Sequence, residues 1–242
     1  EIVLTNLQEI ILIVSMLISI FNFYLIFNLV DKKIIINEHK EDLYLAILAI
    51  TLILFLYFNN LDLLDVIINV LSSLATSGLT LTKSDNNLSL YFLLITIIGG
   101  SLISNTSGIK LTRFFILLKI TSAEIIKLIS PNSVINKTIF NSENKINEDN
   151  VKISFLIFIS FFFSLFVLSS FLILDNIGFE GSFKLSILTL TNTVNSEMFG
   201  LQNLNFANLL TSSKISLIIF MIIGKIELVS IFLILKKILF KD

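Results

Sequence analysis

The longest apolar run without a charged residue is Ile153–Leu174. An α-helix rises 1.5 Å per residue, so about 20 apolar residues cross the hydrocarbon core of a bilayer. The run therefore predicts a helix that spans a membrane. Composition agrees, because 55% of all residues are hydrophobic and 14% are charged, whereas about a quarter of the residues of soluble domains are charged.

The rest of the chain also divides into apolar segments and polar connections. Five further segments are predicted to be spans or parts of spans: Ile10–Val30, Leu43–Phe58, Leu88–Ile103, Leu111–Ile126 and Ile215–Leu239. Two others, Leu61–Leu74 and Phe179–Leu190, are too short to cross and lead into small polar residues. This pattern is typical of a re-entrant helix. We therefore predict an all-α integral membrane protein.

The order of these segments occurs twice along the chain. Each unit consists of a span, a short re-entrant helix, a turn that contains threonine, and a second span. The units cover residues 43–130 and 151–242, and a hydrophilic cytoplasmic loop over residues 131–150 joins them. Residues 1–42 would hold the last span of a preceding unit and a cytoplasmic loop. Both units have the same orientation, as in parallel repeats about an axis along the membrane normal.

Lysine and arginine are distributed unevenly. Thirteen of the 17 lie in residues 31–42, in or beside residues 119–152, or near the C-terminus. Because cytoplasmic loops carry this excess, we predict a multi-pass protein of the cell inner (plasma) membrane with these three regions in the cytoplasm. The single histidine, His39, is expected to be a solvated loop residue. The net charge of −1 disfavours nucleic acid as a partner.

A turn of small residues, Thr76-Ser77-Gly78, follows the first re-entrant helix. Carbonyl oxygens of such a turn can replace the hydration shell of a cation, and glycine allows the positive φ that orients them. Similar clusters also mark ordinary loops. The second unit offers Thr193-Val194-Asn195, with Asn195 at the glycine position, where asparagine tolerates positive φ. In another register Val194 takes that position and would distort the site.

A polar break, Ser104-Asn105-Thr106-Ser107-Gly108, interrupts the second span of the first unit. Unpaired backbone groups at membrane depth are tolerated only inside protein or beside a cavity. We therefore expect the break to line a pathway, unless it is simply a cytoplasmic helix end. Gly99 and Gly100 just before it belong either to the break or to a helix-packing contact.

Lys225 lies near the middle of the last predicted span. A charge at membrane depth indicates function by default. Lys225 either faces the pathway, where it would act as a barrier to a permeating cation, or neutralises an acidic partner in a packed interface. Glu227 is about 200° away around the helix, so the two side chains do not face each other.

These segments resemble the Trk/Ktr/HKT superfamily of potassium transporters, in particular the C-terminal half of its TrkH-type members. The segment from Ile97 to Arg113 is similar to the signature Gly-Gly…Ser-Thr-Gly-Gly-Gly-x-Lys-x-x-Arg, with fewer glycines, and Met221–Glu227 is similar to the family motif Met-Leu-Leu-Gly-Arg-Leu-Glu. The match covers nearly the whole chain in the right order. It implies four span–pore helix–span repeats around a central ion pathway, of which this chain supplies the third and fourth. We expect two more such units before Glu1.

The resemblance implies potassium uptake by a pore-forming subunit, with K⁺ held by the backbone carbonyls of the two turns as the transported ion and no bound cofactor. The implied partners are membrane lipid, a second copy in a homodimer, and a cytosolic nucleotide-binding regulatory subunit of the TrkA type, for which Arg113, Lys119 and Lys127 are candidate docking charges. The alternatives are a sodium-selective or a degenerate, non-conducting subunit of the same fold. A membrane enzyme is disfavoured, because the sequence shows no cluster of catalytic side chains at membrane depth beyond Lys225 and Glu227.

Overall fold

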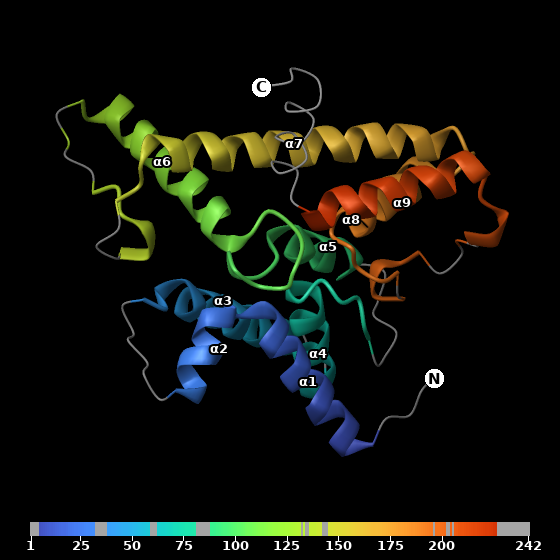
Figure 1. Ribbon diagram of the computed structural model, residues 1–242, viewed down its shortest axis with the longest axis horizontal. Coiled ribbons are helices and arrows are strands. Elements are labelled where there is room, and N and C mark those ends of the chain that lie inside the picture. The colour runs from blue at the N-terminus through green and yellow to red at the C-terminus, as the bar shows by residue number, and fades with distance from the viewer. Residues whose placement is uncertain are drawn as a thin grey trace.

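The computed structural model describes residues 5–31, 38–58, 62–80, 88–131, 133, 136–141, 145–195, 197–201, 204 and 206–226. In this part of the chain the regular structure is helical (Figure 1), apart from one isolated bridge between Thr138 and Lys145. The α-helices are α1 (Asn6–Ile20), α2 (Phe23–Val30), α3 (Lys40–Tyr57), α4 (Leu63–Leu74), α5 (Ser89–Ile98), α6 (Leu111–Ile129), α7 (Glu148–Ile173), α8 (Phe179–Leu190) and α9 (Thr211–Ile226). Three single 3-10 turns are η2 (Ile139–Asn141), η3 (Glu197–Phe199) and η4 (Phe206–Asn208). The predicted all-α class is confirmed for the described residues.

Among the described helices, α7 alone is long and apolar enough to cross a membrane as one continuous helix. It has 26 residues and begins at Glu148, five residues before the predicted span. The described part of α9 ends at Ile226, so the rest of the predicted span Ile215–Leu239 and Glu227 lie outside the described residues.

The prediction of one continuous helix over Ile10–Val30 is wrong. Two helices, α1 and α2, replace it and form an angle of 113°. The bend lies at Asn22, whose side chain accepts a hydrogen bond from the Tyr24 backbone N–H at 2.9 Å and so caps α2. The backbone N–H of Asn22 donates to Asp42 Oδ1, also at 2.9 Å. These two bonds stabilise the start of a new helix within an apolar sequence.

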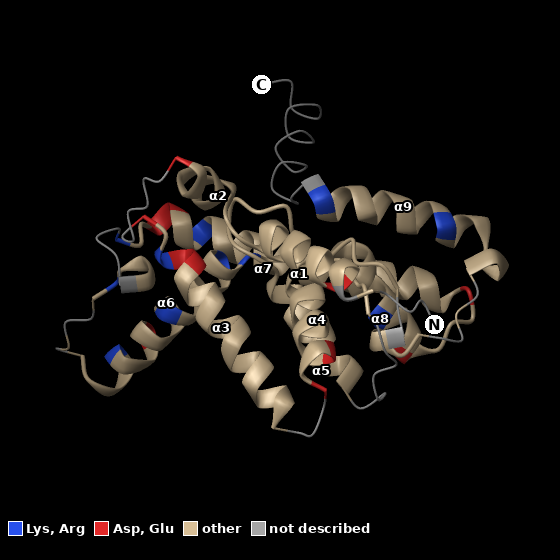
Figure 2. Ribbon diagram, turned by 90° about the horizontal axis from the view of Figure 1, so that it is seen from below, with Lys and Arg blue, Asp and Glu red and all other residues tan. Residues whose placement is uncertain are grey.

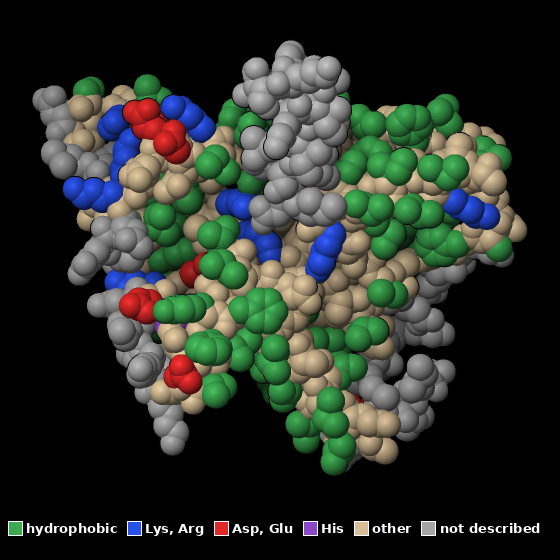
Figure 3. All heavy atoms as spheres, viewed as in Figure 1, with side chains coloured by type: hydrophobic (Ala, Val, Ile, Leu, Met, Phe, Trp, Pro, Cys, Tyr) green, Lys and Arg blue, Asp and Glu red, His purple; other side chains and the backbone are tan. Residues whose placement is uncertain are grey.

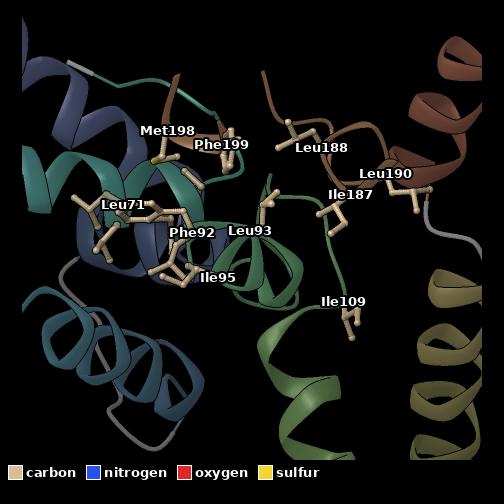
Figure 4. Close-up of a cluster of buried hydrophobic side chains, with 14 of the residues drawn as sticks. Leu71, Phe92, Leu93, Ile95, Ile109, Ile187, Leu188, Leu190, Met198 and Phe199 are labelled. Atoms are coloured by element: carbon tan, nitrogen blue, oxygen red, sulfur yellow. The ribbon is translucent and has the colours of Figure 1, made fainter. Parts of the chain in front are cut away.

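The two short helices α4 and α8 each have 12 residues. Both contain continuous runs of buried residues over their last two turns. The helix α4 packs against α1, α3 and α5, and α8 packs against α5, α7 and α9. The core contains side chains from α1, α3, α4, α5, α7, α8 and η3. Leu71, Phe92, Leu188 and Phe199 are among them (Figure 4).

The predicted hydrophilic loop over residues 131–150 contains a buried anchor. Phe140 is buried and stacks on Phe115 of α6, with ring centroids 4.4 Å apart. It also contacts Tyr44 of α3. The described part of this connection is therefore attached to the helices by aromatic packing, and residues 132, 134, 135 and 142–144 lie outside the described part.

Large hydrophobic side chains cover much of the surface (Figure 3). On α7 the exposed residues include Phe155, Phe163, Phe166 and Phe171. Charged side chains instead gather at the end of the molecule that holds α2, α6 and the start of α3 (Figure 2). Exposed apolar side chains are therefore frequent on the described surface.

Candidate functional site

The turn after α4, here called the α4 turn, consists of Thr76, Ser77 and Gly78. Thr76 has φ of 52° and Gly78 has φ of 73°, both in the left-handed region. The backbone N–H of Ser77 donates to the Ser72 carbonyl at 3.0 Å, and the N–H of Thr76 donates to the Ser73 carbonyl at 3.2 Å. These bonds close the C-terminus of α4 and reverse the chain, as left-handed residues commonly do at helix ends.

The turn after α8 repeats this geometry. Asn192 has φ of 52°, and Thr193 N–H donates to the Leu188 carbonyl at 2.9 Å. Aligning α4 and α8 from their first residues therefore pairs Thr76 with Asn192 and Gly78 with Val194. Of the two registers left open by the sequence, the structure shows the one that puts Val194 at the glycine position. The α8 turn, Thr193-Val194-Asn195, thus has Val194 at the position where the α4 turn has Gly78.

The two turns contact each other directly. The backbone N–H of Val194 donates to the Ser77 carbonyl at 3.3 Å. A Cβ added at Gly78 would overlap the Val194 carbonyl oxygen. Glycine is therefore required at position 78 for two reasons, the positive φ and the close approach of the α8 turn.

The helix break is longer than predicted. The helix α5 ends at Ile98, five residues before the predicted end of the apolar segment, and α6 begins at Leu111. The break therefore covers residues 99–110 rather than 104–108. It starts at Gly99, which has φ of 67°. The chain folds back on itself here, so that a Cβ at Gly99 would overlap the Ser107 carbonyl oxygen. Gly99 thus belongs to the break and not to a contact between regular helices.

A buried lysine holds the break together. Lys110 is 4% exposed and has φ of 75°. Its ammonium donates to the Ser104 carbonyl at 3.2 Å, to the hydroxyls of Ser104 and Thr106 at 3.1 Å, and to the Thr106 carbonyl. A fixed positive charge therefore satisfies oxygen atoms that the broken helix leaves without backbone partners. In the sequence Lys110 stands out only as part of the motif between Ile97 and Arg113.

Two carboxylates lie at the start of α3, and one of them bonds to the break. Glu41 accepts a hydrogen bond from the Leu102 backbone N–H at 2.7 Å. Asp42 is 3% exposed and lies 3.5 Å from His39 Nδ1. The expectation that His39 is solvated is wrong, because the side chain is 5% exposed and its Nε2 lies 3.1 Å from the Asn28 side-chain amide. Burial raises the pKa of the Glu41 carboxyl, which lies before the predicted span.

Lys225 and the break come together. The Lys225 ammonium donates to the Asn105 carbonyl at 2.8 Å and to Asn105 Oδ1 at 3.2 Å. The preceding residue, Gly224, allows α9 to approach the end of α8, because a Cβ there would overlap the Leu190 carbonyl oxygen. A cavity of about 230 Å³ lies at this contact. It is lined by all of the predicted pathway residues together with three others: Leu102, Ser104, Asn105, Thr106, Ser107, Gly108, Lys110, Gly224 and Lys225.

The break also touches the α4 turn. The Ser107 backbone N–H donates to the Thr76 hydroxyl at 3.2 Å. The α8 turn instead borders a second hollow of about 460 Å³ between α8 and α9. The structure therefore brings Thr76, the break and Lys225 into one connected site, and joins the α8 turn to it through Ser77.

The candidate docking charges lie apart from this cavity. Arg113, Lys119 and Lys127 are all on α6. Lys127 lies 3.7 Å from Glu124, which also pairs with Lys137 at 3.3 Å. These ion pairs are exposed, so they contribute little to stability.

No protein-family model matches the sequence, and a search of curated proteins found no match. In structure the chain is similar to the crystal structure of the potassium transporter TrkH from Vibrio parahaemolyticus, with a TM-score of 0.82 and 20% sequence identity. The similarity covers 97% of this chain and 53% of that one, so the chain spans about half the length of the TrkH structure. The chain therefore has the fold of about half of that TrkH structure.

Proposed function

We propose that this chain lies in a membrane and forms part of the pore of a potassium-uptake protein, with a role in transport rather than catalysis. The observation that carries the proposal is the connected site of the α4 turn, the break and Lys225, found within a TrkH-like fold. The apolar outer face of α7 supports the membrane location, because such a face is stable in lipid and not in water.

In this proposal the carbonyl oxygens of the two turns bind dehydrated K⁺, the transported ion, as neutral ligands. The cation then passes the break, where Lys225 presents a positive charge at the Asn105 carbonyl. Because like charges repel, we propose that the Lys225 contact represents a closed pathway. Transport would require this contact to open and the ammonium to move aside.

Two turns cannot surround a cation by themselves. We propose that two further span–pore helix–span units complete the ring, so that residues 43–130 and 151–242 act as the third and fourth repeats. The proposed setting is the cell inner membrane, with residues 31–42, 119–152 and the C-terminus in the cytoplasm. There Arg113, Lys119 and Lys127 would face a nucleotide-binding regulatory subunit of the TrkA type, and a second copy would form a homodimer.

A second candidate function rests on Val194. Its N–H donates to the Ser77 carbonyl, an oxygen that would otherwise be available to a cation. A turn without glycine at this position binds K⁺ less well, which favours a sodium-selective or non-conducting subunit of the same fold. The two candidates differ in transport and agree in architecture.

A complementation assay distinguishes the two candidate functions. The natural full-length gene is expressed in a bacterium that lacks its own potassium-uptake systems, and growth is measured over a range of low K⁺ concentrations, with the empty vector as control. Growth at K⁺ levels that do not support the control supports potassium uptake. Membrane expression without growth, or uptake of Na⁺ alone in vesicles, would reject potassium uptake in favour of the second candidate.

A further inference from the structure

An apolar groove lies between α5, α7 and α8. Its volume is about 490 Å³. The walls are formed by Leu93, Leu94 and Ile97 of α5, Phe162 of α7 and Phe183 of α8. None of these residues belongs to the two turns or to the break, so the proposed transport pathway does not account for the groove.

The groove has one polar end. Lys184 is 8% exposed, and its ammonium lies 3.2 Å from the Ser89 hydroxyl and 2.6 Å from Glu180 Oε1. Glu180 in contrast is 81% exposed. The buried ammonium of Lys184 and the accessible carboxylate of Glu180 lie together at the mouth of the groove. They present one positive and one negative charge to a molecule that occupies it.

The dimensions of the groove match an acyl chain. It extends along α5 from Ser89 to Ile97, which is about 12 Å at 1.5 Å per residue. One leaflet of the hydrocarbon core is about 15 Å thick. The polar end is formed by the first turns of α5 and α8, and the lysine and arginine distribution predicts that Lys184 faces the outer side. The groove therefore has the depth and direction of an outer-leaflet chain.

The charges of Lys184 and Glu180 favour some lipid headgroups over others. A phosphate oxygen would accept from Lys184, because Ser89 and Glu180 are its partners among the described residues and an ammonium has three N–H groups. A primary ammonium on the same headgroup would donate to Glu180. A quaternary ammonium has no N–H to donate, and an anionic headgroup without an amine would meet the Glu180 carboxylate unfavourably.

We propose that the groove between α5, α7 and α8 is a binding site for a phosphatidylethanolamine-type lipid, with one acyl chain between the helices, its phosphate at Lys184 and its amine at Glu180. The inference rests on the proposed membrane location but not on potassium transport. A second copy of the chain could cover the same apolar surface, and the experiment distinguishes that outcome.

The test is photo-crosslinking in vesicles. The natural full-length protein is reconstituted in phosphatidylcholine that contains a minor fraction of phosphatidylethanolamine with a diazirine on its acyl chain, and labelled peptides are identified by mass spectrometry. We expect labelling to concentrate on α5 and α8. Unlabelled phosphatidylethanolamine should reduce it several-fold more than phosphatidylcholine or phosphatidylglycerol.

Two variants sharpen the test. Leu94→Trp fills the groove and should reduce labelling of α8 several-fold, whereas Leu118→Trp, at an equally exposed leucine on α6, should leave it unchanged. Lys184→Gln should remove the preference for phosphatidylethanolamine. Labelling spread evenly over all exposed helices, equal competition by the three lipids, or a crosslink from α5 to a second protein copy would each overturn the proposal. Because labelling needs no ion flux, a protein that fails to transport K⁺ can still pass this test.

Discussion

The hydroxyl oxygen of Thr76 accepts a hydrogen bond from the backbone N–H of Ser107 at 3.2 Å. Both residues are buried, with 7% and 4% of their surface exposed. Thr76 belongs to the α4 turn and Ser107 to the break, so this bond connects the proposed ion-binding turn to the proposed closing segment. We therefore predict that a change in the Thr76 side chain affects the break.

Replacing Thr76 with Val tests this connection. Val keeps the shape of the side chain and removes the hydroxyl, which leaves the buried Ser107 N–H without its acceptor at a cost of about 1–3 kcal/mol. We expect a lower unfolding temperature of the purified protein in detergent and altered K⁺ uptake. Thr76→Ser retains the acceptor and is the control, so equal behaviour of the two variants would contradict the connection.

Gly78 should tolerate no side chain. Its φ of 73° costs an L-residue about 1–2 kcal/mol, and a Cβ would also overlap the Val194 carbonyl oxygen. We expect Gly78→Ala to reduce the preference for K⁺ over Na⁺ in uptake assays. Gly178→Ala is a matched control, because a Cβ at Gly178 meets no atom within 4 Å. Unchanged ion preference in Gly78→Ala would remove the α4 turn from the pathway.

Much of the helical layout follows from the sequence, because each short helix is an apolar segment with clear polar limits. The helix α8 begins and ends at the predicted residues, Phe179 and Leu190. The bend at Asn22 was not predicted, because apolar residues continue on both sides and the stabilising partner, Asp42, lies 20 residues away. The repetition of whole units stays a prediction, although the turns after α4 and α8 share their local geometry.

The candidate site was only partly predictable, because the burial and contacts of its residues depend on how the chain folds. Ser104, Asn105 and Lys225 stand out in the sequence as polar residues in apolar surroundings. Lys110 stands at a helix start, where a solvated lysine is unremarkable, and its burial depends on how the break folds. The start of the break at Gly99 was missed because Leu102 and Ile103 prolong the apolar pattern. A histidine and two carboxylates directly before an apolar span were the available signal for the buried contact between His39 and Asp42.

Val194 offers a gain-of-function test. Gly78 has positive φ, whereas Val194 is not among the described residues that do. Val194→Gly would let the α8 turn adopt the backbone angles of the α4 turn and weaken its hold on the Ser77 carbonyl. We expect a higher ratio of K⁺ to Na⁺ uptake. If the ratio and the flux both stay at the wild-type level, the α8 turn does not contribute to ion selection.

Lys110 should be important for stability rather than for ion preference. Its ammonium bonds to oxygen atoms of Ser104 and Thr106, and hydrogen bonds to charged groups contribute about 1.5–3 kcal/mol each. Lys110→Met should therefore lower the unfolding temperature in detergent markedly. Lys152→Met removes an exposed lysine that pairs with Glu148, and a surface pair of this kind is worth about 0–1 kcal/mol. Similar losses in the two variants would show that Lys110 does not hold the break.

The contacts of Lys225 favour its role as a barrier to cations over its role as a structural partner of a carboxylate. Within the described residues its hydrogen-bond acceptors are the carbonyl and side-chain oxygens of Asn105, which are uncharged. Removing the ammonium therefore leaves no described carboxylate unpaired, and the penalty expected for breaking a buried ion pair does not apply. A positive charge at this place opposes a permeating cation.

Lys225→Ala should accordingly raise cation flux in vesicles while the amount of protein in the membrane stays unchanged. Lys225→Arg keeps the charge and should keep the low flux. Lys214→Ala, on the same helix but bonded to the Ala207 carbonyl, is the positional control. Lower expression of Lys225→Ala at unchanged specific flux would instead assign Lys225 to packing, since the residue would then stabilise α9 against the break without obstructing the ion.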